Sequence, residues 1–196
     1  LIPLLNDGQG RFTPQPSARA RSPWHPFLAD FNHDGRLDLA AAAMDGKTIA
    51  TLLGNGRGGF ADAVRHEVFP RPFLAKAADF NNDGHLDIYG VHDDHGRLTI
   101  LQGNGQGAFT QAPGSPFDIG AEAYGAHALG RTIYVCTLKG ELKRFTGRAF
   151  EPASNLKCSY RLDSADFDGD GSPELVTVDP DANQVHIVSA QPRARN

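Results

Sequence analysis

The sequence predicts an all-β fold: a β-propeller of about four blades, each a four-stranded antiparallel sheet. Two repeated features predict it. A nine-residue acidic loop occurs three times, and a glycine-rich turn that ends in phenylalanine also occurs three times. The first two acidic loops begin at Asp30 and Asp79, 49 residues apart, and Phe60 and Phe109 end two of the turns at the same separation. A fixed period near 50 with about four short strands per unit is typical of propeller blades.

The three acidic loops, residues 30–38, 79–87 and 166–174, share one arrangement of oxygen-bearing side chains. Each has carboxylates or amides at positions 1, 3 and 5, glycine at position 6 and a carboxylate at position 9. Ca²⁺ takes six to eight oxygen ligands, and this spacing directs several of them toward one point. An EF-hand closes with Glu at position 12 between two helices. Because these loops close at position 9 and strand-like residues follow, we expect each to join two antiparallel strands.

We predict three Ca²⁺ sites, one in each acidic loop. Side chains at positions 1, 3, 5 and 9 and the backbone carbonyl at position 7 are the predicted ligands. They are Asp30, Asn32, Asp34, Arg36 and Asp38; Asp79, Asn81, Asp83, His85 and Asp87; and Asp166, Asp168, Asp170, Ser172 and Glu174. Protein oxygens and a water can complete the coordination, so we expect structural ions and a metal-dependent fold. The alternative is a set of metal-free Asx-turns.

The repeats divide the chain into approximate blades. These are residues 24–70, 71–118, 119–155, and 156–190 combined with 1–16. The third blade lacks an acidic loop and is not expected to bind Ca²⁺. Joining the two ends of the chain in one blade would close the ring and leave no open sheet edge. Ile2–Leu5 and Val185–Val188 both align with a third strand, so a fragment of a larger propeller and half of a dimeric ring remain alternatives.

The chain has two cysteines, Cys136 and Cys158, both in or just after the blade that lacks an acidic loop. A disulfide between them would replace the missing metal, and the alternative is a pair of buried thiols. Ca²⁺ sites of modest affinity and propeller repeats both favour an oxidising compartment, in which we expect the disulfide to form. We therefore expect an extracytoplasmic protein, which is to say secreted, periplasmic or on the cell surface.

The loops and turns resemble those of the FG-GAP/VCBS repeat family. The same repeats build the propellers of integrin α-subunits, of several fungal and bacterial lectins, and of modules attached to bacterial polysaccharide enzymes. The resemblance covers roughly residues 1 to 190. It implies a Ca²⁺-stabilised propeller that recognises a glycan or a protein surface. Lectin-like carbohydrate binding is the first expectation. Integrin-type protein adhesion and an accessory or catalytic propeller of a polysaccharide-degrading enzyme are the alternatives.

Two further clusters attract attention. The segment from His92 to His95 carries two histidines and two aspartates, which would suit Zn²⁺, although an exposed polar turn is the simpler interpretation. Trp24 is the only tryptophan and precedes His25. Its ring would either stack on a sugar or fill a gap between blades, and we expect packing because tryptophan is usually largely buried. No counterpart of Trp24 is evident in the other blades.

Other functions are disfavoured. The chain has no nucleophile elbow, zinc-protease motif, P-loop or dinucleotide-binding motif, so we expect no enzymatic activity. Basic residues are scattered, which argues against nucleic-acid binding. No stretch of apolar residues is long enough to predict a membrane span. The expected partners are a glycan or protein ligand, and a second copy of the chain if the protein forms a homo-oligomer.

Overall fold

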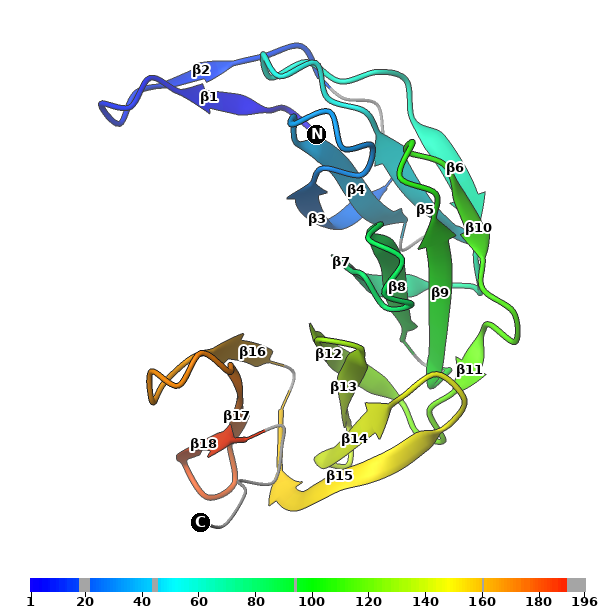
Figure 1. Ribbon diagram of the computed structural model, residues 1–196, viewed down its shortest axis with the longest axis vertical. Coiled ribbons are helices and arrows are strands. Elements are labelled where there is room, and N and C mark those ends of the chain that lie inside the picture. The colour runs from blue at the N-terminus through cyan, green and yellow to red at the C-terminus, as the bar shows by residue number, and fades with distance from the viewer. Residues whose placement is uncertain (18–21, 44–45, 94, 160, 190–196) are drawn as a thin grey trace.

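The computed structural model describes residues 1–17, 22–43, 46–93, 95–159 and 161–189. All regular structure in these residues is β-strand, and they contain no helix that could cross a membrane. Four antiparallel sheets follow one another around an arc, with a separate two-stranded hairpin at its N-terminal end (Figure 1). The first strands of the four sheets line the hollow of the arc, and the last strands lie outside. The predicted all-β propeller of four blades is confirmed.

Each sheet is one blade with its strands in chain order. The first blade comprises β3 (Pro23–Ala29), β4 (Asp38–Ala43), β5 (Thr48–Leu52) and β6 (Val64–Glu67). The second comprises β7 (Pro72–Ala78), β8 (Asp87–His92), β9 (Arg97–Gly103) and β10 (Phe109–Gln111), with β11 (Phe117–Asp118) also paired to β9. The third comprises β12 (Ala123–Leu129), β13 (Thr132–Thr137), β14 (Glu141–Phe145) and β15 (Phe150–Lys157). The fourth has three strands, β16 (Leu162–Ala165), β17 (Glu174–Asp179) and β18 (Gln184–Val188).

The core consists of layers between successive blades. Strands β4 and β8 are buried along their whole length because a neighbouring sheet or loop covers each face. Between the first two blades, Phe31, Ile49 and Ile88 belong to one apolar cluster. The acidic loops join β3 to β4, β7 to β8 and β16 to β17, and each of these strand pairs is antiparallel, as predicted.

Phenylalanine occupies position 2 of all three acidic loops, and from its apolar side chain we expect it to anchor each loop in the core. Phe31 is buried, and Phe80 packs face to face with Phe145 of the next blade at a ring separation of 5.7 Å. Phe167 is different, since it is 53% exposed. Phe31 and Phe80 each have a following blade to pack against, whereas the fourth blade ends the arc, so the expectation is wrong for Phe167.

The N-terminal hairpin does not complete the fourth blade. Strands β1 (Leu4–Asn6) and β2 (Phe12–Pro14) pair only with each other, and β18 pairs with β17. The expectation that both ends of the chain share one blade is therefore wrong. The hairpin lies against the first blade at the opposite end of the arc (Figure 1).

The hairpin occupies the place of the outer strands of a further blade. A Cβ atom at Gly58 would lie 2.8 Å from the side chain of Leu5. One repeat later, a Cβ atom at Gly107 would lie 2.8 Å from the side chain of Leu53. The hairpin thus contacts the first blade as the first blade contacts the second. This repeated contact explains why residues 2–5 align with third strands.

Cys136 and Cys158 form a disulfide with a Cα–Cα distance of 5.9 Å, which confirms the predicted bond. Cys136 lies in β13, and Cys158 directly follows β15, so the bond links the second strand of the third blade to the end of its last strand. In the same blade a short turn between β12 and β13 replaces the acidic loop.

Candidate calcium loops and an aromatic row

The first acidic loop is folded around its own carboxylates. Asp30 accepts the backbone N–H groups of Asp34 and Gly35, at 3.2 and 2.9 Å. Asp34 in turn accepts the N–H of Arg36 at 2.9 Å. Position 4, His33, has a φ of 58°, which turns the chain back on itself. The side-chain oxygens at positions 1 and 5 are therefore held toward the interior of a tight loop.

The other two loops repeat this arrangement with different residues. Asp79 accepts the N–H groups of Asp83 and Gly84, at 3.1 and 3.0 Å. In the third loop Asp166 accepts the N–H groups of Gly169 and Gly171, at 2.7 and 3.0 Å. Position 4 again has positive φ, at 60° for Asn82 and 76° for Gly169. Three separate sequences thus adopt the same loop geometry.

The third loop has the donor set that best fits a cation. Carboxylate oxygens of Asp166, Asp168 and Glu174 lie within 4.8 Å of one another. An all-oxygen, anionic donor set of this kind suits Ca²⁺. In the first loop, Asn32 instead donates its amide to Asp34 at 3.2 Å, and in the second Asn81 donates to Asp83 at 2.9 Å. The third loop therefore brings three predicted ligands together. The full ligand sets of the first two loops stay a prediction.

The carboxylate at position 9 has a role that the sequence interpretation missed. Asp38 accepts the N–H of Phe31 at 2.9 Å and the N–H of Gly54 at 2.8 Å. Asp87 makes the same two bonds one repeat later, to Phe80 at 3.1 Å and to Gly103 at 3.0 Å. This side chain therefore connects each acidic loop to the glycine-rich turn of its own blade. The equal spacing of both elements along the chain was the available signal.

The glycines that donate these bonds, Gly54 and Gly103, are required for close packing. A Cβ atom at Gly54 would collide with the backbone carbonyl of Leu37, and one at Gly103 would collide with that of Leu86. In each blade the glycine-rich turn therefore lies directly against the residue that precedes the position-9 carboxylate. Acidic loop and turn form one rigid unit.

The ionisation of the loop carboxyls reflects these contacts. The N–H of His85 and the amide of Asn81 hold the pKa of Asp83 below its ordinary value. Desolvation acts to raise the pKa of Asp30, but backbone N–H groups of the loop outweigh it and the pKa is lowered. Burial raises the pKa of Asp87. Asp30 and Asp83 are therefore anionic at neutral pH, as a cation ligand must be.

Neighbouring acidic loops also contact each other. Nε2 of His33 in the first loop lies 3.1 Å from Nδ1 of His85 in the second. The two imidazole rings are tilted at 53° with centroids 5.3 Å apart. The first two predicted Ca²⁺ sites therefore lie on the same edge of adjacent blades.

The segment from His92 to His95 is only in part the expected exposed polar turn, because His92 and Asp93 are buried whereas His95 is exposed. His92 is fully buried, with Nδ1 donating to the carbonyl of Pro70 at 3.0 Å and Nε2 accepting from the hydroxyl of Thr99 at 2.8 Å. Asp93 is also buried and pairs with Arg71 at 2.8 Å. Both ring nitrogens of His92 therefore already form hydrogen bonds within the protein. Asp94, which also belonged to the proposed Zn²⁺ cluster, lies outside the described residues.

Trp24 does not fill a gap between blades, so the packing interpretation is wrong. It lies on the innermost strand of the first blade and is 45% exposed. Its ring is 6.4 Å from that of Phe73, on the innermost strand of the second blade. Phe73 lies 4.9 Å from Tyr124, on the innermost strand of the third. We call Trp24, Phe73 and Tyr124 the aromatic row.

The residues of the aromatic row are equivalent positions of the repeat. Each comes directly after the first residue of its innermost strand, which pairs with the last residue of the second strand of the blade. Each also lies where the pairing register between these two strands shifts. Trp24 and Phe73 both stand six residues before the first aspartate of an acidic loop, and so does Tyr160. Tyr160 itself lies outside the described residues. This spacing is the signal that could have identified the counterparts of Trp24.

A pocket of about 460 Å³ opens beside the aromatic row, among the innermost strands of all four blades. The ring of His25, whose φ is 43°, lies 4.9 Å from that of Phe73 in a T-shaped contact and forms part of the wall. Lys76, Arg161 and Asp163 supply its charged groups. The hollow side of the arc thus carries both flat aromatic surfaces and charged side chains.

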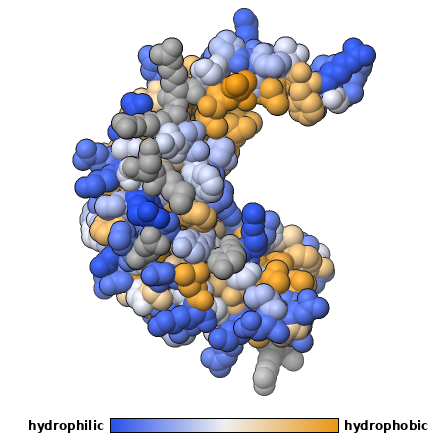
Figure 2. All heavy atoms as spheres, turned by 180° about the vertical axis from the view of Figure 1, so that it is seen from behind, coloured by the Kyte–Doolittle hydropathy of each residue, from blue (hydrophilic) through white to orange (hydrophobic). Residues whose placement is uncertain are grey.

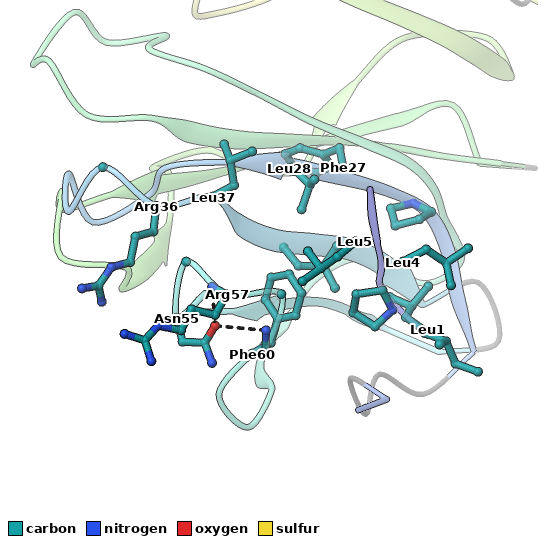
Figure 3. Close-up of a pocket in the computed structure, with 18 residues that line it drawn as sticks. Leu1, Leu4, Leu5, Phe27, Leu28, Arg36, Leu37, Asn55, Arg57 and Phe60 are labelled. Carbon is teal, nitrogen blue, oxygen red and sulfur yellow. Dashed lines mark hydrogen bonds between the residues drawn. The ribbon is translucent and has the colours of Figure 1, made fainter. Parts of the chain in front are cut away.

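A larger apolar groove of about 800 Å³ lies between the N-terminal hairpin and the first blade. Leu4, Leu5, Leu28 and Leu37 line it and are 41% to 58% exposed. Figure 2 shows hydrophobic residues gathered on the arm that carries the hairpin. Below the groove, Asn55 accepts two backbone N–H groups of the glycine-rich turn and fixes its shape (Figure 3).

Comparison with solved structures identifies proteins of similar fold. The chain matches two solved propeller structures, each over about half of their length. One is BBS1N from its complex with ARL6DN, with a TM-score of 0.62 and 13% identity, covering 92% of this chain and 56% of that chain. The other is a lectin from Agrocybe aegerita that recognises non-reducing terminal N-acetylglucosamine, with a TM-score of 0.57 and 19% identity, covering 90% of this chain and 55% of that chain.

No curated protein matches the chain in sequence. The sequence pattern of FG-GAP-like repeats matches residues 30–90 and 79–130, which span the first two blades, their acidic loops and the start of the third blade. The matched segments together cover more than half of the chain. The chain belongs to the FG-GAP-like repeat family.

Proposed function

We propose that this chain is a calcium-stabilised, non-enzymatic recognition module that works outside the cytoplasm and binds glycans along the aromatic row. The observation that carries the proposal is the recurrence of an aromatic ring at one position of successive blades, exposed at Trp24 and half-buried at Phe73 and Tyr124. Trp24, Phe73 and Tyr124 are neighbours on the hollow side of the arc. Aromatic rings offer flat apolar area, against which the C–H faces of sugar rings pack.

Calcium has a structural role in this proposal. Asp166, Asp168 and Glu174 would hold one ion, and the matching residues of the first two loops would hold two more. A bound Ca²⁺ neutralises the carboxylates that each loop gathers. Because the position-9 carboxylates also hold the glycine-rich turns, we expect the ions to stiffen whole blades. Strands β3 and β7, which carry Trp24 and Phe73, lead directly into two of these loops.

Two observations support the glycan assignment and the compartment. A lectin is among the propellers of similar shape, although at 19% identity this similarity extends to the fold alone. The disulfide between Cys136 and Cys158 suits an oxidising, extracytoplasmic environment.

Protein binding is the second candidate, and the apolar groove beside the hairpin favours it. Four exposed leucines line this groove, and contiguous exposed apolar surface often marks a protein contact. The solved structure of BBS1N is a complex with another protein. The glycan proposal ranks first because Trp24 is 45% exposed, so packing alone does not account for an aromatic residue at this repeated position.

A glycan array tests the two candidates. The Ca²⁺-loaded protein and its Trp24→Ala variant are applied in parallel, with a sample treated with EDTA as a third arm. Binding by the wild-type protein that is lost in Trp24→Ala supports the proposal. Glycan binding that Trp24→Ala retains would place the site elsewhere. No binding by a protein shown to be folded would contradict the glycan assignment and leave protein recognition.

A further inference from the structure

The pocket beside the aromatic row has the charge and shape to select one class of glycan. Its walls come from the innermost strands of all four blades. Phe73 and Tyr124 form one side, with their rings 4.9 Å apart. Lys76, Arg161 and Asp163 form the polar part. Apolar rings on one side and a few convergent polar groups on the other are typical of small-ligand sites.

Lys76 is a partly buried cation that lacks an anionic partner. Its ammonium contacts Nδ1 of His127 at 3.4 Å, and no carboxylate among the described residues forms a salt bridge with it. Desolvation by burial lowers the pKa of Lys76, although the carboxylate of Asp163 partly offsets that effect. A buried charge is ordinarily paired, because burial without a partner is costly. A bound anion would supply the missing partner.

His127 cannot serve as that partner. Its Nε2 lies 2.8 Å from the hydroxyl of Ser164, and Lys76 donates to its Nδ1. Burial lowers the pKa of His127, and the adjacent Lys76 lowers it further, so the ring is neutral at pH 7. A neutral imidazole that accepts from Lys76 and donates to Ser164 satisfies both contacts. This bonding orients the ammonium group, whose charge is compensated only in part, by Asp163, which lies 4.0 Å from Nδ1 of His127.

The balance of charges favours a monoanion. Lys76 and Arg161 contribute two positive charges to the pocket, and Asp163 contributes one negative charge. The Asp163 side chain is 86% exposed, so it can accept hydrogen bonds from hydroxyl groups at the rim. One carboxylate on the ligand would neutralise the remaining positive charge. A sugar ring that bears hydroxyls and one carboxylate, and that offers a C–H face to an aromatic ring, is a uronic acid.

We propose that this pocket binds a uronate residue of an acidic glycan, with its carboxylate at Lys76 and Arg161 and its ring against Phe73 and Tyr124. The inference rests on the proposed glycan function and names the class of sugar that the site selects. The two cations provide charge-assisted hydrogen bonds to the carboxylate. Asp163 disfavours phosphate monoesters, whose charge at pH 7 exceeds that of one carboxylate.

Calorimetric titration tests the inference. The full chain, loaded with Ca²⁺, is titrated with a trimer of galacturonic acid and separately with the galactose trimer of the same linkage. The variants are Lys76→Met, which keeps the length of the side chain, and Arg161→Gln, which alters an exposed residue. Lys47→Met removes an exposed lysine elsewhere and is the matched control. Thermal melts of each variant establish that it is folded.

We expect the acidic trimer to bind more tightly than the neutral one. Lys76→Met and Arg161→Gln should each weaken binding of the acidic trimer roughly tenfold or more, while Lys47→Met leaves it unchanged. Equal binding of both trimers by all variants would overturn the uronate inference and leave the glycan function standing. Binding of neither trimer, together with binding to neutral glycans on an array, would likewise overturn the uronate inference and leave the glycan function standing. Binding of polyglutamate in place of either trimer, with loss in Lys76→Met, would assign the pocket to acidic peptides and overturn the inference.

Discussion

The ring of Trp24 lies 6.4 Å from the ring of Phe73, and the two residues stand one repeat of 49 positions apart. Their proximity follows from the fold, because the innermost strands of successive blades converge on the hollow of the arc (Figure 1). A side chain repeated at this position therefore becomes part of one continuous surface. We therefore expect this surface to take part in glycan binding.

Trp24→Ala should weaken glycan binding roughly tenfold while the protein stays folded, with a lower melting temperature. The side chain is 45% exposed, so its removal also loses the buried part of the ring and its contacts with His25 and Phe73. Loss of an aromatic stacking surface removes about 1.4 kcal/mol or more of binding free energy, which corresponds to tenfold in affinity. Phe12→Ala, an exposed aromatic on the hairpin and away from the row, is the matched control. Equal weakening in both variants would show that the effect is not local to the row.

Asp38→Ala should destabilise the protein even with the calcium concentration held constant. The substitution leaves the buried N–H groups of Phe31 and Gly54 without their acceptor. Each unsatisfied buried group costs about 1–3 kcal/mol, so we expect a loss of about 3 kcal/mol in the free energy of unfolding. Urea denaturation measures it. Asp62→Ala, which removes an exposed carboxylate outside the loops, should have almost no effect. A change below 1 kcal/mol for Asp38→Ala would contradict the structural role given to position 9.

Three Ca²⁺ ions should bind to each chain, and Asp168→Ala should reduce the number to two. Asp168 belongs to the carboxylate cluster of the third loop, so its removal affects that site alone. At a free Ca²⁺ concentration about 100 times Kd, each intact site adds about 2.7 kcal/mol to stability. Elemental analysis after dialysis gives the number of ions, and thermal melts with and without EDTA give the stabilisation. A melting temperature that EDTA leaves unchanged would exclude structural metal sites.

His92 should make the protein less stable as the pH falls from 6.5 toward 4. Burial lowers the pKa of His92 to about 4, while the carbonyl of Pro70 opposes the shift only in part. Because the folded pKa lies below the unfolded value of 6.5, the unfolded state binds more protons in this window. Stability is therefore fully present above pH 6.5, and about 3 kcal/mol is lost by pH 4.

The measurement is the difference in unfolding free energy between wild type and His92→Gln at several pH values. Both proteins contain the acidic loops, so the effect of loop titration on the unfolding free energy cancels in this difference. Gln106→Ala, an exposed and uncharged substitution in the glycine-rich turn of the same blade, is the control and should follow the wild-type profile. Parallel pH profiles for wild type and His92→Gln would show that the buried imidazole does not titrate as expected.

The repeat period revealed most of the fold. The positions of the acidic loops and glycine-rich turns predicted four blades and their strand order, because each blade must satisfy the same backbone geometry. The ends of the arc were harder to predict. Whether Leu5 contacts the first blade or the fourth depends on long-range packing, and both strand alignments were available from the sequence. The exposure of Phe167 has the same origin, since it depends on whether a further blade follows.

The site was predicted in part. Oxygen ligands at fixed loop positions follow a known coordination pattern, so the carboxylate cluster around Asp166 could be anticipated. The aromatic row could not be recognised by residue type, because the repeat position holds a different aromatic residue in each blade. The constant distance to the acidic loop reveals Phe73 as the counterpart of Trp24, whereas Tyr124 lies in the blade that lacks such a loop. The hydrogen bonds of Asp38 to two separate segments required the folded structure.

Fluorescence of Trp24 during a glycan titration tests the central claim most directly. The chain contains one tryptophan, so its emission reports on the aromatic row alone. We predict that a glycan identified on the array produces a saturable change in emission in the presence of Ca²⁺. The change should disappear when EDTA removes the metal and return when Ca²⁺ is restored. A glycan that binds by calorimetry without changing the emission of Trp24 would contradict recognition by the aromatic row.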